Sequence, residues 1–515
     1  MSRGANLDIR VARDYHDRTA HSRWSVRQRG HFLDWETKPF LYKVYPDLPV
    51  IQLSRKVMPL DLDTLEALSS GCQAETGLTV AGLFTLLFFS AGITKKKAYP
   101  DGGEIHFRAA PSTGALYQTE VYVVAGELPG LAAGVYHFCP RDFTLRLLRE
   151  GDFRRAVAEA AADPGFTRAP ATLVLTAIYW RNTWKYQARA YRHLFWDSGS
   201  LLANLLAVAS ALGLPARVVA GFADARVNRL LGLEAEKEAS LELVPVGREG
   251  APAPEHPPVE EIAPRYLPLS ASEVDYPLLR EMHAASSLGD PADVSRWRTD
   301  PAPRRADPPS SLLALPAPRS RSERTLGETI LRRGSTREFA RASIGGEEFS
   351  TALFHATRGF PIDASSGLVD LYLIVNAVEG LEAGAYCYWP GLHAVELVKP
   401  GEFRREAGFL CLEQALGADA SFVIFFLADL GPILERYGNR GYRLANLAAG
   451  LIGGRSYLAA YALGFGASGL TFYDGEVAGF FAPHAKGKDA LFVTALGRSV
   501  EGIPRSTVSL RSPGQ

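Results

Sequence analysis

The strongest constraint on the fold is an internal duplication with a period of about 250 residues. One copy begins at Ser112 and reads STGALYQTEVYVVAGELPGLAAGVYHF; the other begins at Ser365 and reads SSGLVDLYLIVNAVEGLEAGAYCYW. Both continue through a turn and a strand into Gly-[Asp/Glu]-Phe-Arg-Arg, which opens a helix. Because solenoid repeats are far shorter, about 20–50 residues, this period indicates duplication of a whole domain.

Two further blocks keep the same register. Lys185 opens KYQARAYRHLFWDSGSLLANLLAVASALGL and Arg436 opens RYGNRGYRLANLAAGLIGGRSYLAAYALGF, both long helical patterns with small apolar faces. Strand patterns ending at Gly247 and Gly497 close the copies. We therefore expect a pseudo-twofold dimer within one chain, with the helix after Tyr191 between the copies. Whether the chain is a monomer or dimerises further stays open.

Four segments are predicted along the chain. They are an N-terminal segment (1–48), a first domain (49–248), a Pro-rich linker (249–321) and a second domain (322–507). The linker contains APAPEHPP and DPAPRRADPP, a composition typical of a segment that spans or wraps and has little core of its own. A short helix is expected within it, around residues 278–285.

Apolar, β-rich runs alternate with helical patterns in each copy. Strands are expected at 120–125, 172–178 and 241–246, with helices between them. The predicted fold class is α+β, with a mixed or antiparallel sheet flanked by helices. The longest apolar run, 80–94, is too short to span a bilayer and is expected to form a buried helix.

Charge and cysteine usage exclude several classes of protein. Lys+Arg and Asp+Glu number 56 each, so the global basic field of a nucleic-acid-binding protein is absent. The four cysteines are far apart, and the eleven histidines show no tight metal-ligand spacing, so no metal site is expected. We expect a cytoplasmic protein with buried thiols and neither a nucleic-acid nor a membrane partner.

Two short motifs could hold a ligand that carries a phosphate or a planar ring. The segment LRRGSTREF places three arginines and two hydroxyls within residues 332–337, and guanidinium forks bind phosphate through paired hydrogen bonds. Residues 111–114, Pro-Ser-Thr-Gly, precede an apolar strand; the proline sets a turn and the glycine allows close approach of the backbone. In isolation, a solvated basic turn and an ordinary strand-entry turn explain these motifs better.

Two other motifs also allow both a functional and a purely structural interpretation. The run GFGASG at 464–469 matches a dinucleotide-binding pattern, but a helix precedes it and a strand, LTFY, is expected after it, so a helix C-cap followed by a close-approach loop fits better. Lys185 and Tyr186 open a helix and could act as a general acid or base pair. A solvated lysine beside a core tyrosine is the default interpretation of such a pair. The second copy has Arg436 and Tyr437 there, and an arginine cannot deprotonate.

Taken together, these motifs resemble those of the nitroreductase-like flavoproteins, and within them the oxidases that convert azolines to azoles in ribosomal peptide maturation. The resemblance rests on RRGSTREF, on PSTGALYQTEVYVV with GVYHF, on KYQARAYRH with its long helix, and on the closing strand and glycine. It covers both copies. It implies two fused nitroreductase-like domains of the α+β class, with FMN in the cleft between them.

The resemblance also implies roles for individual residues. In the second copy Arg332, Arg333, Ser335 and Arg337 would hold the FMN phosphate and ribityl chain, and Arg498 would add to that site. In the first copy Pro111, Ser112 and Gly114 would line the flavin. Gly466, Ala467, Ser468 and Gly469 would pass near its N5 edge. Lys185 and Tyr186 match the Lys-Tyr pair of the azoline oxidases.

The two copies depart from the family pattern in opposite ways. The first has no clear arginine segment, the nearest being LSRKVMPLDLD around Arg55, and the second has Asp-Ala-Ser-Ser-Gly at 363–367 where the first has the Pro-Ser-Thr-Gly turn. Each site of a twofold dimer takes one half from each subunit. We therefore expect one complete site, and one FMN per chain. The sequence leaves open whether Lys185 and Tyr186 face that site or the degenerate one.

Three functions remain open at this point. The leading one is an FMN-dependent oxidoreductase that transfers hydride to flavin N5, specifically an azoline dehydrogenase acting on a peptide-derived or small-molecule substrate. The second is an NAD(P)H-dependent reductase of nitro compounds or quinones. The third is a flavin-free scaffold or binding protein whose two sites have degenerated.

Overall fold

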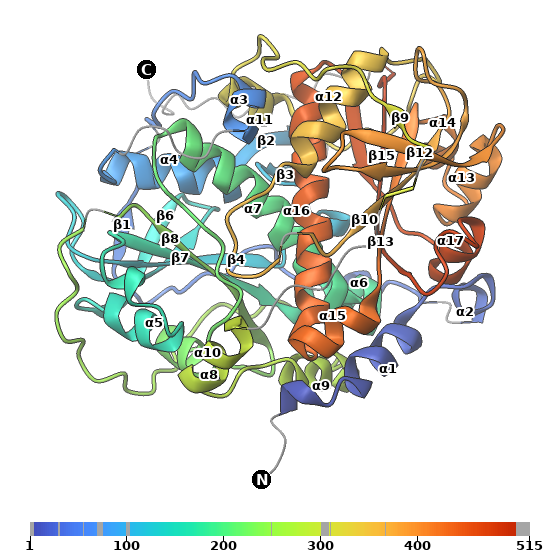
Figure 1. Ribbon diagram of the computed structural model, residues 1–515. Helices are drawn as coiled ribbons and strands as arrows, with labels where there is room; N and C mark the ends of the chain where they lie inside the picture. Colours follow the sequence, from blue (N-terminus) through green and yellow to red (C-terminus); the bar gives the residue numbers. More distant parts are fainter. Residues whose placement is uncertain are drawn as a thin grey trace.

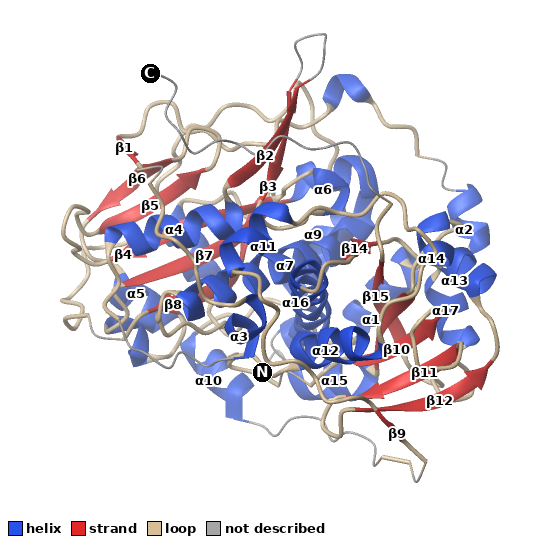
Figure 2. Cartoon of the chain, turned by 90° about the horizontal axis from the view of Figure 1, so that it is seen from above, coloured by secondary structure: helices blue, strands red, loops and turns tan. Residues whose placement is uncertain are grey.

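The computed structural model describes residues 5–28, 31–54, 56–69, 76–98, 104–248, 250–299, 308–309, 311–365 and 367–500. Two antiparallel sheets stand on either side of a central pair of long helices, α7 (Ala190–Ala211) and α16 (Arg440–Ala462) (Figure 1). Seen from above, this helix pair separates the two sheets (Figure 2). The expected α+β class and the two-domain arrangement are both present.

Read in opposite directions, the two sheets share one order over six strands, as duplication requires, and β14 is an additional edge strand of the second. The first runs β1-β6-β5-β4-β7-β8 and the second β14-β15-β13-β10-β11-β12-β9. The first sheet and its hairpin contain β1 (Val50–Gln52), β2 (Ile93–Ala98), β3 (Glu104–Arg108), β4 (Thr119–Ala125), β5 (Gly134–Cys139), β6 (Thr144–Glu150), β7 (Ala171–Ile178) and β8 (Glu238–Val246). The second contains β9 (Leu313–Ala314), β10 (Asp370–Val375), β11 (Gly384–Trp389), β12 (Ala394–Pro400), β13 (Phe422–Ala428), β14 (Gly466–Gly469) and β15 (Asp489–Gly497).

Helices cover both sheets. Those before and within the first copy are α1 (Arg10–Thr19), α2 (Arg23–Gln28), α3 (Thr64–Ser69), α4 (Val80–Ala91), α5 (Arg154–Ala160), α6 (Tyr179–Tyr186), α7 and α8 (Asp224–Leu231). The linker and the second copy contribute α9 (Pro277–Ala285), α10 (Pro291–Thr299), α11 (Leu326–Arg332), α12 (Gly346–Thr357), α13 (Arg404–Leu410), α14 (Ala415–Asp419), α15 (Leu430–Tyr437), α16 and α17 (Asp474–Phe480). Short 3₁₀ turns are η1 (Ala5–Leu7), η2 (Trp35–Thr37), η3 (Thr113–Ala115), η4 (Pro164–Thr167) and η5 (Gln187–Arg189).

The packing of α7 against α16 explains their small-residue patterns. A Cβ added to Gly199 would lie 2.6 Å from the backbone nitrogen of Leu451, and one added to Gly450 would lie 2.6 Å from backbone atoms of Trp196. Since 199 and 450 are equivalent positions of the repeat, the helices cross closely at the pseudo-twofold axis. This confirms that the helix after Tyr191 joins the copies. The stretch Tyr179–Ala211, which covers α6 and α7, is by length and composition apolar enough to cross a membrane, but 83% of its most apolar window is buried inside the protein.

Two buried ion clusters related by the pseudo-twofold tie the copies together. Asp474 of the second copy pairs with Arg189 at 2.9 Å and with Arg192 at 2.5 Å, both from the first copy. In the reciprocal cluster, Asp224 of the first copy pairs at 2.7 Å each with Arg440 and Arg443 of the second. All six side chains are buried. The neighbouring arginines hold the pKa of each carboxyl below its ordinary value, against the effect of burial.

The N-terminal segment and the linker contribute more to the fold than their composition suggested. The expected linker helix is α9, and with α10 it buries Leu279, Met282 and Trp297. Helices α9 and α1 are followed by equivalent contacts. The backbone nitrogen of Leu288, after α9, donates to Asp224 at 2.9 Å, and that of His21, after α1, donates to Asp474 at 2.8 Å. The linker thus wraps onto both domains and adds Leu279, Met282 and Trp297 to their shared core.

Candidate functional site

The arginine-rich loop of the second domain reaches the first domain through Arg333. This side chain is 6% exposed, and it donates from Nε to the carbonyl oxygen of Ala109 at 2.9 Å and from Nη2 to that of Arg108 at 3.0 Å. Lys95 of β2 donates to the carbonyl oxygens of Arg332 and Arg333 at 2.7 Å each. These bonds hold residues 332–337 beside residues 108–114, so two motifs from different copies lie at one place.

The Pro-Ser-Thr-Gly turn is held by Asp197, the one acidic residue of helix α7. Its carboxylate accepts hydrogen bonds from Ser112 Oγ at 2.5 Å, Thr113 Oγ1 at 2.7 Å and Gln118 Nε2 at 2.7 Å, as well as from the Thr113 backbone. Pro111, Ser112 and Asp197 also line a small cavity of about 20 Å³. Because the equivalent residue of the second copy is Ala448, only the first copy can hold the turn in this way.

Burial raises the pKa of Asp197 to about 6, although these hydrogen bonds oppose the rise. A carboxyl whose folded pKa lies above its unfolded value stabilises the fold at low pH and loses that contribution as pH rises through the folded pKa. Relative to Asp197→Asn, the wild-type protein should therefore lose about 2 kcal/mol of unfolding free energy between pH 4.5 and 7.5. Urea unfolding of both proteins at the two pH values measures this, and a constant difference would contradict it.

Lys185 and Tyr186 face the site built from these two motifs. They end α6, and the chain then breaks sharply at Gln187, which adopts a positive φ of 51° where the second copy has Gly438. A Cβ added to Gly114 would lie 3.0 Å from the Tyr186 hydroxyl, so the turn approaches this phenol closely. The Tyr186 ring also packs edge-on against His193, with centroids 4.4 Å apart.

The electrostatics of the pair suit proton transfer. Partial burial, followed by the positive charge of Arg337, lowers the pKa of Lys185. Burial and the nearby charge of Asp197 raise the pKa of Tyr186, so its phenol stays protonated at neutral pH. A lysine with a lowered pKa beside a neutral phenol can act as a general base next to a hydrogen-bond donor.

Gly466, Ala467, Ser468 and Gly469 form the edge strand β14, which pairs with β15. The strand expected at LTFY is therefore wrong: it begins four residues earlier, because the small side chains of GASG let the arginine loop lie directly on it. Thr336 donates its backbone N–H to the Ala467 carbonyl at 2.9 Å. Tyr457 accepts a hydrogen bond from the Gly469 backbone at 2.6 Å and lies 3.4 Å from Ser335 Oγ.

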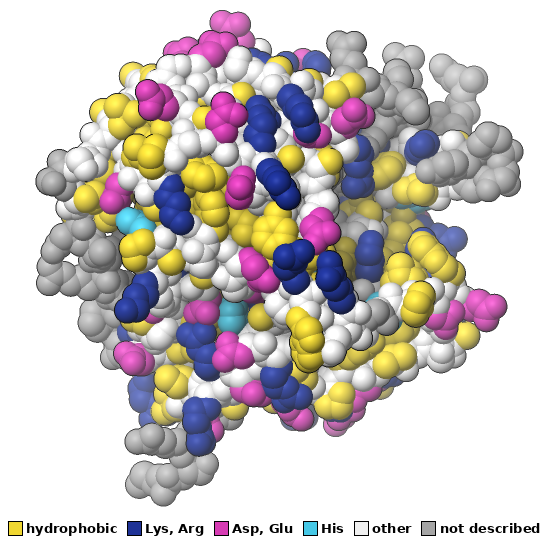
Figure 3. Space-filling view, turned by 90° about the vertical axis from the view of Figure 1, so that its right-hand side faces the viewer, with side chains coloured by type: hydrophobic (Ala, Val, Ile, Leu, Met, Phe, Trp, Pro, Cys, Tyr) yellow, Lys and Arg dark blue, Asp and Glu magenta, His cyan; other side chains and the backbone are white. Residues whose placement is uncertain are grey.

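Exposed cationic groups surround this site. Arg332 and Arg337 are exposed, and their guanidinium groups make no hydrogen bond or ion pair with any residue that the structure describes. The backbone of Arg498 lies beside this loop, whereas its guanidinium group forms an ion pair with Glu348 at 2.7 Å. The face shown in Figure 3 is hollowed toward the right, with Lys and Arg side chains in and beside the hollow.

The pseudo-symmetric position is filled by protein side chains. There the Asp363 carboxylate accepts from the backbone nitrogens of Ala220 at 2.7 Å and Gly221 at 3.1 Å, and it pairs with Arg298 at 2.9 Å. The Trp297 ring packs so closely on Gly221 that an added Cβ would lie 2.6 Å from it. The sequence around Arg55 was the nearest candidate for the missing arginine half, and Arg55 lies outside the described residues.

Sequence reasoning missed Asp197, Lys95 and Tyr457. A lone acid within the apolar run HLFWDSGSLLANLL was a usable signal for Asp197, since an acidic side chain is seldom fully buried unless it is paired. Lys95 and Tyr457 lie in an ordinary hairpin strand and a long helix, and no local pattern distinguishes them.

Comparison with known proteins agrees with this architecture. The nitroreductase family model matches residues 90–248 and 330–495, one match in each domain. A protein of Methanocaldococcus jannaschii described as a nitroreductase is 31% identical over 173 residues, which are 33% of this chain and 82% of that protein. The microcin B17-processing protein McbC of Escherichia coli is 32% identical over 158 residues, 28% of this chain and about half (54%) of McbC.

One solved structure resembles the whole chain. A crystal structure from Anabaena variabilis, described as that of a nitroreductase, superposes with a TM-score of 0.77 at 27% identity and covers 95% of this chain and 99% of its own. The duplicated architecture is therefore shared across the full length of both proteins. With the family model matching both halves of the duplication, the chain belongs to the nitroreductase family.

Proposed function

We propose that the protein is an FMN-dependent oxidoreductase that dehydrogenates azoline rings in a peptide substrate. The observation that carries this proposal is the contact of Arg333 with Arg108 and Ala109. It joins the arginine half of one copy to the Pro-Ser-Thr-Gly half of the other, and Lys185 and Tyr186 face the same place.

The donor set fits FMN. Arg332 and Arg337 offer exposed guanidinium groups, and Ser335 adds a hydroxyl on the same loop, as a phosphate and a ribityl chain require. Pro111, Ser112 and Gly114 would line the ring from the first copy, and β14 would present small residues near its reactive edge. We leave Arg498 out of the phosphate site because Glu348 already neutralises its guanidinium.

We expect one FMN per chain. At the pseudo-symmetric position the carboxylate of Asp363 accepts hydrogen bonds from the backbone N–H groups, and its negative charge would repel a phosphate. The ring of Trp297 fills the space over Gly221. The equivalent of Asp363 in the first copy is Ala110. Among the described residues, only one of the two related positions therefore offers exposed guanidinium groups without a carboxylate on its backbone donors.

In the proposed reaction the bound flavin supplies the acceptor for the hydride of the azoline ring. Lys185, in its neutral form, would remove the proton from the adjacent ring carbon. Tyr186, which stays protonated, would donate a hydrogen bond that holds the ring in place. The names of two relatives, the microcin B17-processing protein and the trifolitoxin-processing protein of Rhizobium leguminosarum, which is 29% identical over 169 residues, support a peptide as the substrate.

A second candidate is an NAD(P)H-dependent nitro or quinone reductase. The match to 82% of the M. jannaschii protein described as a nitroreductase favours it. Anaerobic addition of NADPH separates the two candidates: rapid loss of flavin absorbance supports the reductase, whereas unchanged absorbance followed by bleaching with a thiazoline peptide supports the dehydrogenase. A colourless protein that takes up no FMN would support the scaffold instead.

Flavin binding should depend on the exposed arginines. Because a hydrogen bond to a charged group contributes about 1.5–3 kcal/mol, Arg337→Ala should weaken FMN binding by roughly 10- to 100-fold. The matched control is Arg341→Ala, an exposed arginine a few residues further along that pairs with Asp419. Absorbance titration of the apoprotein gives affinity and stoichiometry, and two tightly bound flavins per chain would contradict the single-site proposal.

A further inference from the structure

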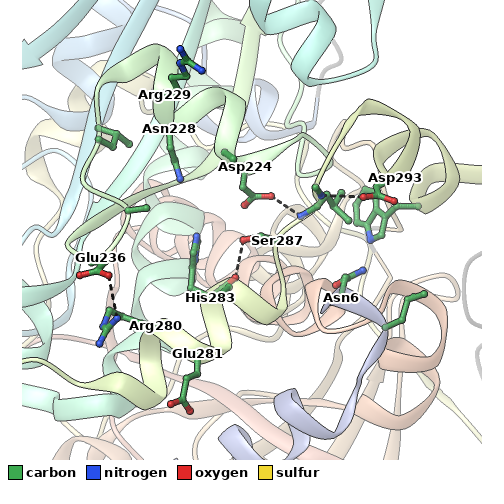
Figure 4. Close-up of a pocket in the computed structure, with 18 of the residues that line it drawn as sticks. Asn6, Asp224, Asn228, Arg229, Glu236, Arg280, Glu281, His283, Ser287 and Asp293 are labelled. Carbon is green, nitrogen blue, oxygen red and sulfur yellow. Dashed lines mark hydrogen bonds and ion pairs between the residues drawn. The ribbon is translucent and has the colours of Figure 1, made fainter. Parts of the chain in front are cut away.

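A large cavity lies in the region that the pseudo-twofold axis relates to the proposed flavin site. It measures about 1470 Å³ and is enclosed by α8, α9, α10, η1 and the end of α15 (Figure 4). Tyr437, the counterpart of Tyr186, lines it, and Trp297 forms one wall. The cavity therefore belongs to the half of the duplication that has lost the flavin-binding residues.

Two polar side chains, His283 and Asn228, line its base. His283 is 6% exposed, and its Nε2, which has no hydrogen-bond partner among the described residues, is closed off from the open space. Asn228 uses Oδ1 to accept from the Ser240 backbone nitrogen at 3.0 Å and from Ser240 Oγ at 2.8 Å, which leaves its amide nitrogen toward the cavity. Figure 4 shows the side chains of Asn228 and His283 directed toward each other. The Asn228 amide nitrogen, a donor with no partner among the described residues, is therefore the group that offers a ligand a hydrogen bond at the base of the cavity.

The charge of the wall restricts what that ligand can be. Four arginines and five carboxylates line it, so neither sign dominates, and a polyanion such as a nucleotide would meet as much repulsion as attraction. Leu233, Ile262 and Leu288 add apolar surface. Small-molecule pockets are typically about 300–1,000 Å³, and this cavity is larger. An extended peptide has the backbone donors and acceptors, mixed charge and apolar side chains that such a wall matches.

We propose that this cavity docks a segment of the peptide substrate remote from the ring being oxidised. The inference rests on the proposed function, and it assigns the degenerate half of the duplication to substrate recognition. Binding energy from a remote segment that is equal in the ground and transition states lowers KM and leaves kcat unchanged.

The test fills the cavity from two elements of its wall with Ala284→Trp on α9 and Ala235→Trp after α8, both at exposed lining positions. The control is Ala415→Trp, at an exposed position that begins α14, outside the cavity. The substrates are two pools of thiazoline peptides with randomised flanks, one with a single residue on each side of the ring and one with eight. Fluorescence anisotropy of labelled long peptides gives a readout independent of turnover.

We expect each filling variant to raise KM for the long pool about tenfold or more, to weaken its direct binding equally, and to leave kcat and all short-pool constants unchanged. The Ala415→Trp control should match the wild-type protein. Turnover of the short pool with an unchanged long-pool KM in both filling variants would overturn the docking proposal while the proposed function stands. No turnover of either pool would overturn the proposed function, and the docking proposal with it.

Discussion

Lys185→Ala should retain FMN and lower the turnover of thiazoline peptides by roughly 100- to 10,000-fold, the range expected when a general base is removed. The base acts only when neutral. Since burial and Arg337 lower the pKa of Lys185 below its ordinary value, wild-type turnover should rise with pH through that lowered pKa. Single-turnover bleaching of the flavin across a pH series measures both effects.

Two variants sharpen this test. Lys185→Arg keeps the positive charge but cannot deprotonate, so it should be nearly as slow as Lys185→Ala. Lys486→Ala removes an exposed lysine from the turn between α17 and β15 and should behave as the wild-type protein. A Lys185→Ala protein with full turnover and an unchanged pH profile would remove Lys185 from the mechanism.

Asp474→Asn should lower the free energy of unfolding by about 3–5 kcal/mol, because it leaves the buried guanidinium groups of Arg189 and Arg192 without their counter-charge. The carboxylate also accepts the backbone N–H of His21, so the N-terminal segment should loosen in the same variant. Urea unfolding measures the loss, and protease sensitivity near residue 21 reports the second effect.

The duplication supplies a matched comparison for this variant. Asp224→Asn breaks the reciprocal cluster with Arg440 and Arg443 and should cost a similar amount. Asp47→Asn removes one partner of an exposed pair with Arg265 and should leave the free energy of unfolding unchanged within error. Equal stabilities of Asp474→Asn and Asp47→Asn would mean that the buried clusters do not hold the copies together.

Local patterns were sufficient for the elements of the fold. The strands expected at 120–125, 172–178 and 241–246 appear as β4, β7 and β8, each buried along its whole length, and the run 80–94 contains helix α4. Such runs are recognisable because burial on both faces demands continuous apolar sequence. The repeat spacing likewise predicted two copies joined by their long helices.

The same local reasoning failed where contacts join distant residues. It placed the closing strand of GFGASG four residues too late, because nothing nearby in sequence shows that Thr336 hydrogen-bonds to Ala467. It could not show what the linker packs against, because the position of Trp297 depends on a close contact with Gly221 of the first domain. Asp224 and Asp474 occupy equivalent positions of the repeat, but their partners lie on the other copy.

From the residues alone one could infer two unlike copies, each carrying half of a binding motif. Only the packing of the copies decided that these halves meet at Arg333 and Ala109, with Lys185 and Tyr186 beside them. It also decided that protein side chains fill the pseudo-symmetric position and that a large cavity opens next to it. The physical reason is that the crossing of α7 and α16, set by the close contact of Gly199 and Gly450, brings together residues more than 200 positions apart in sequence.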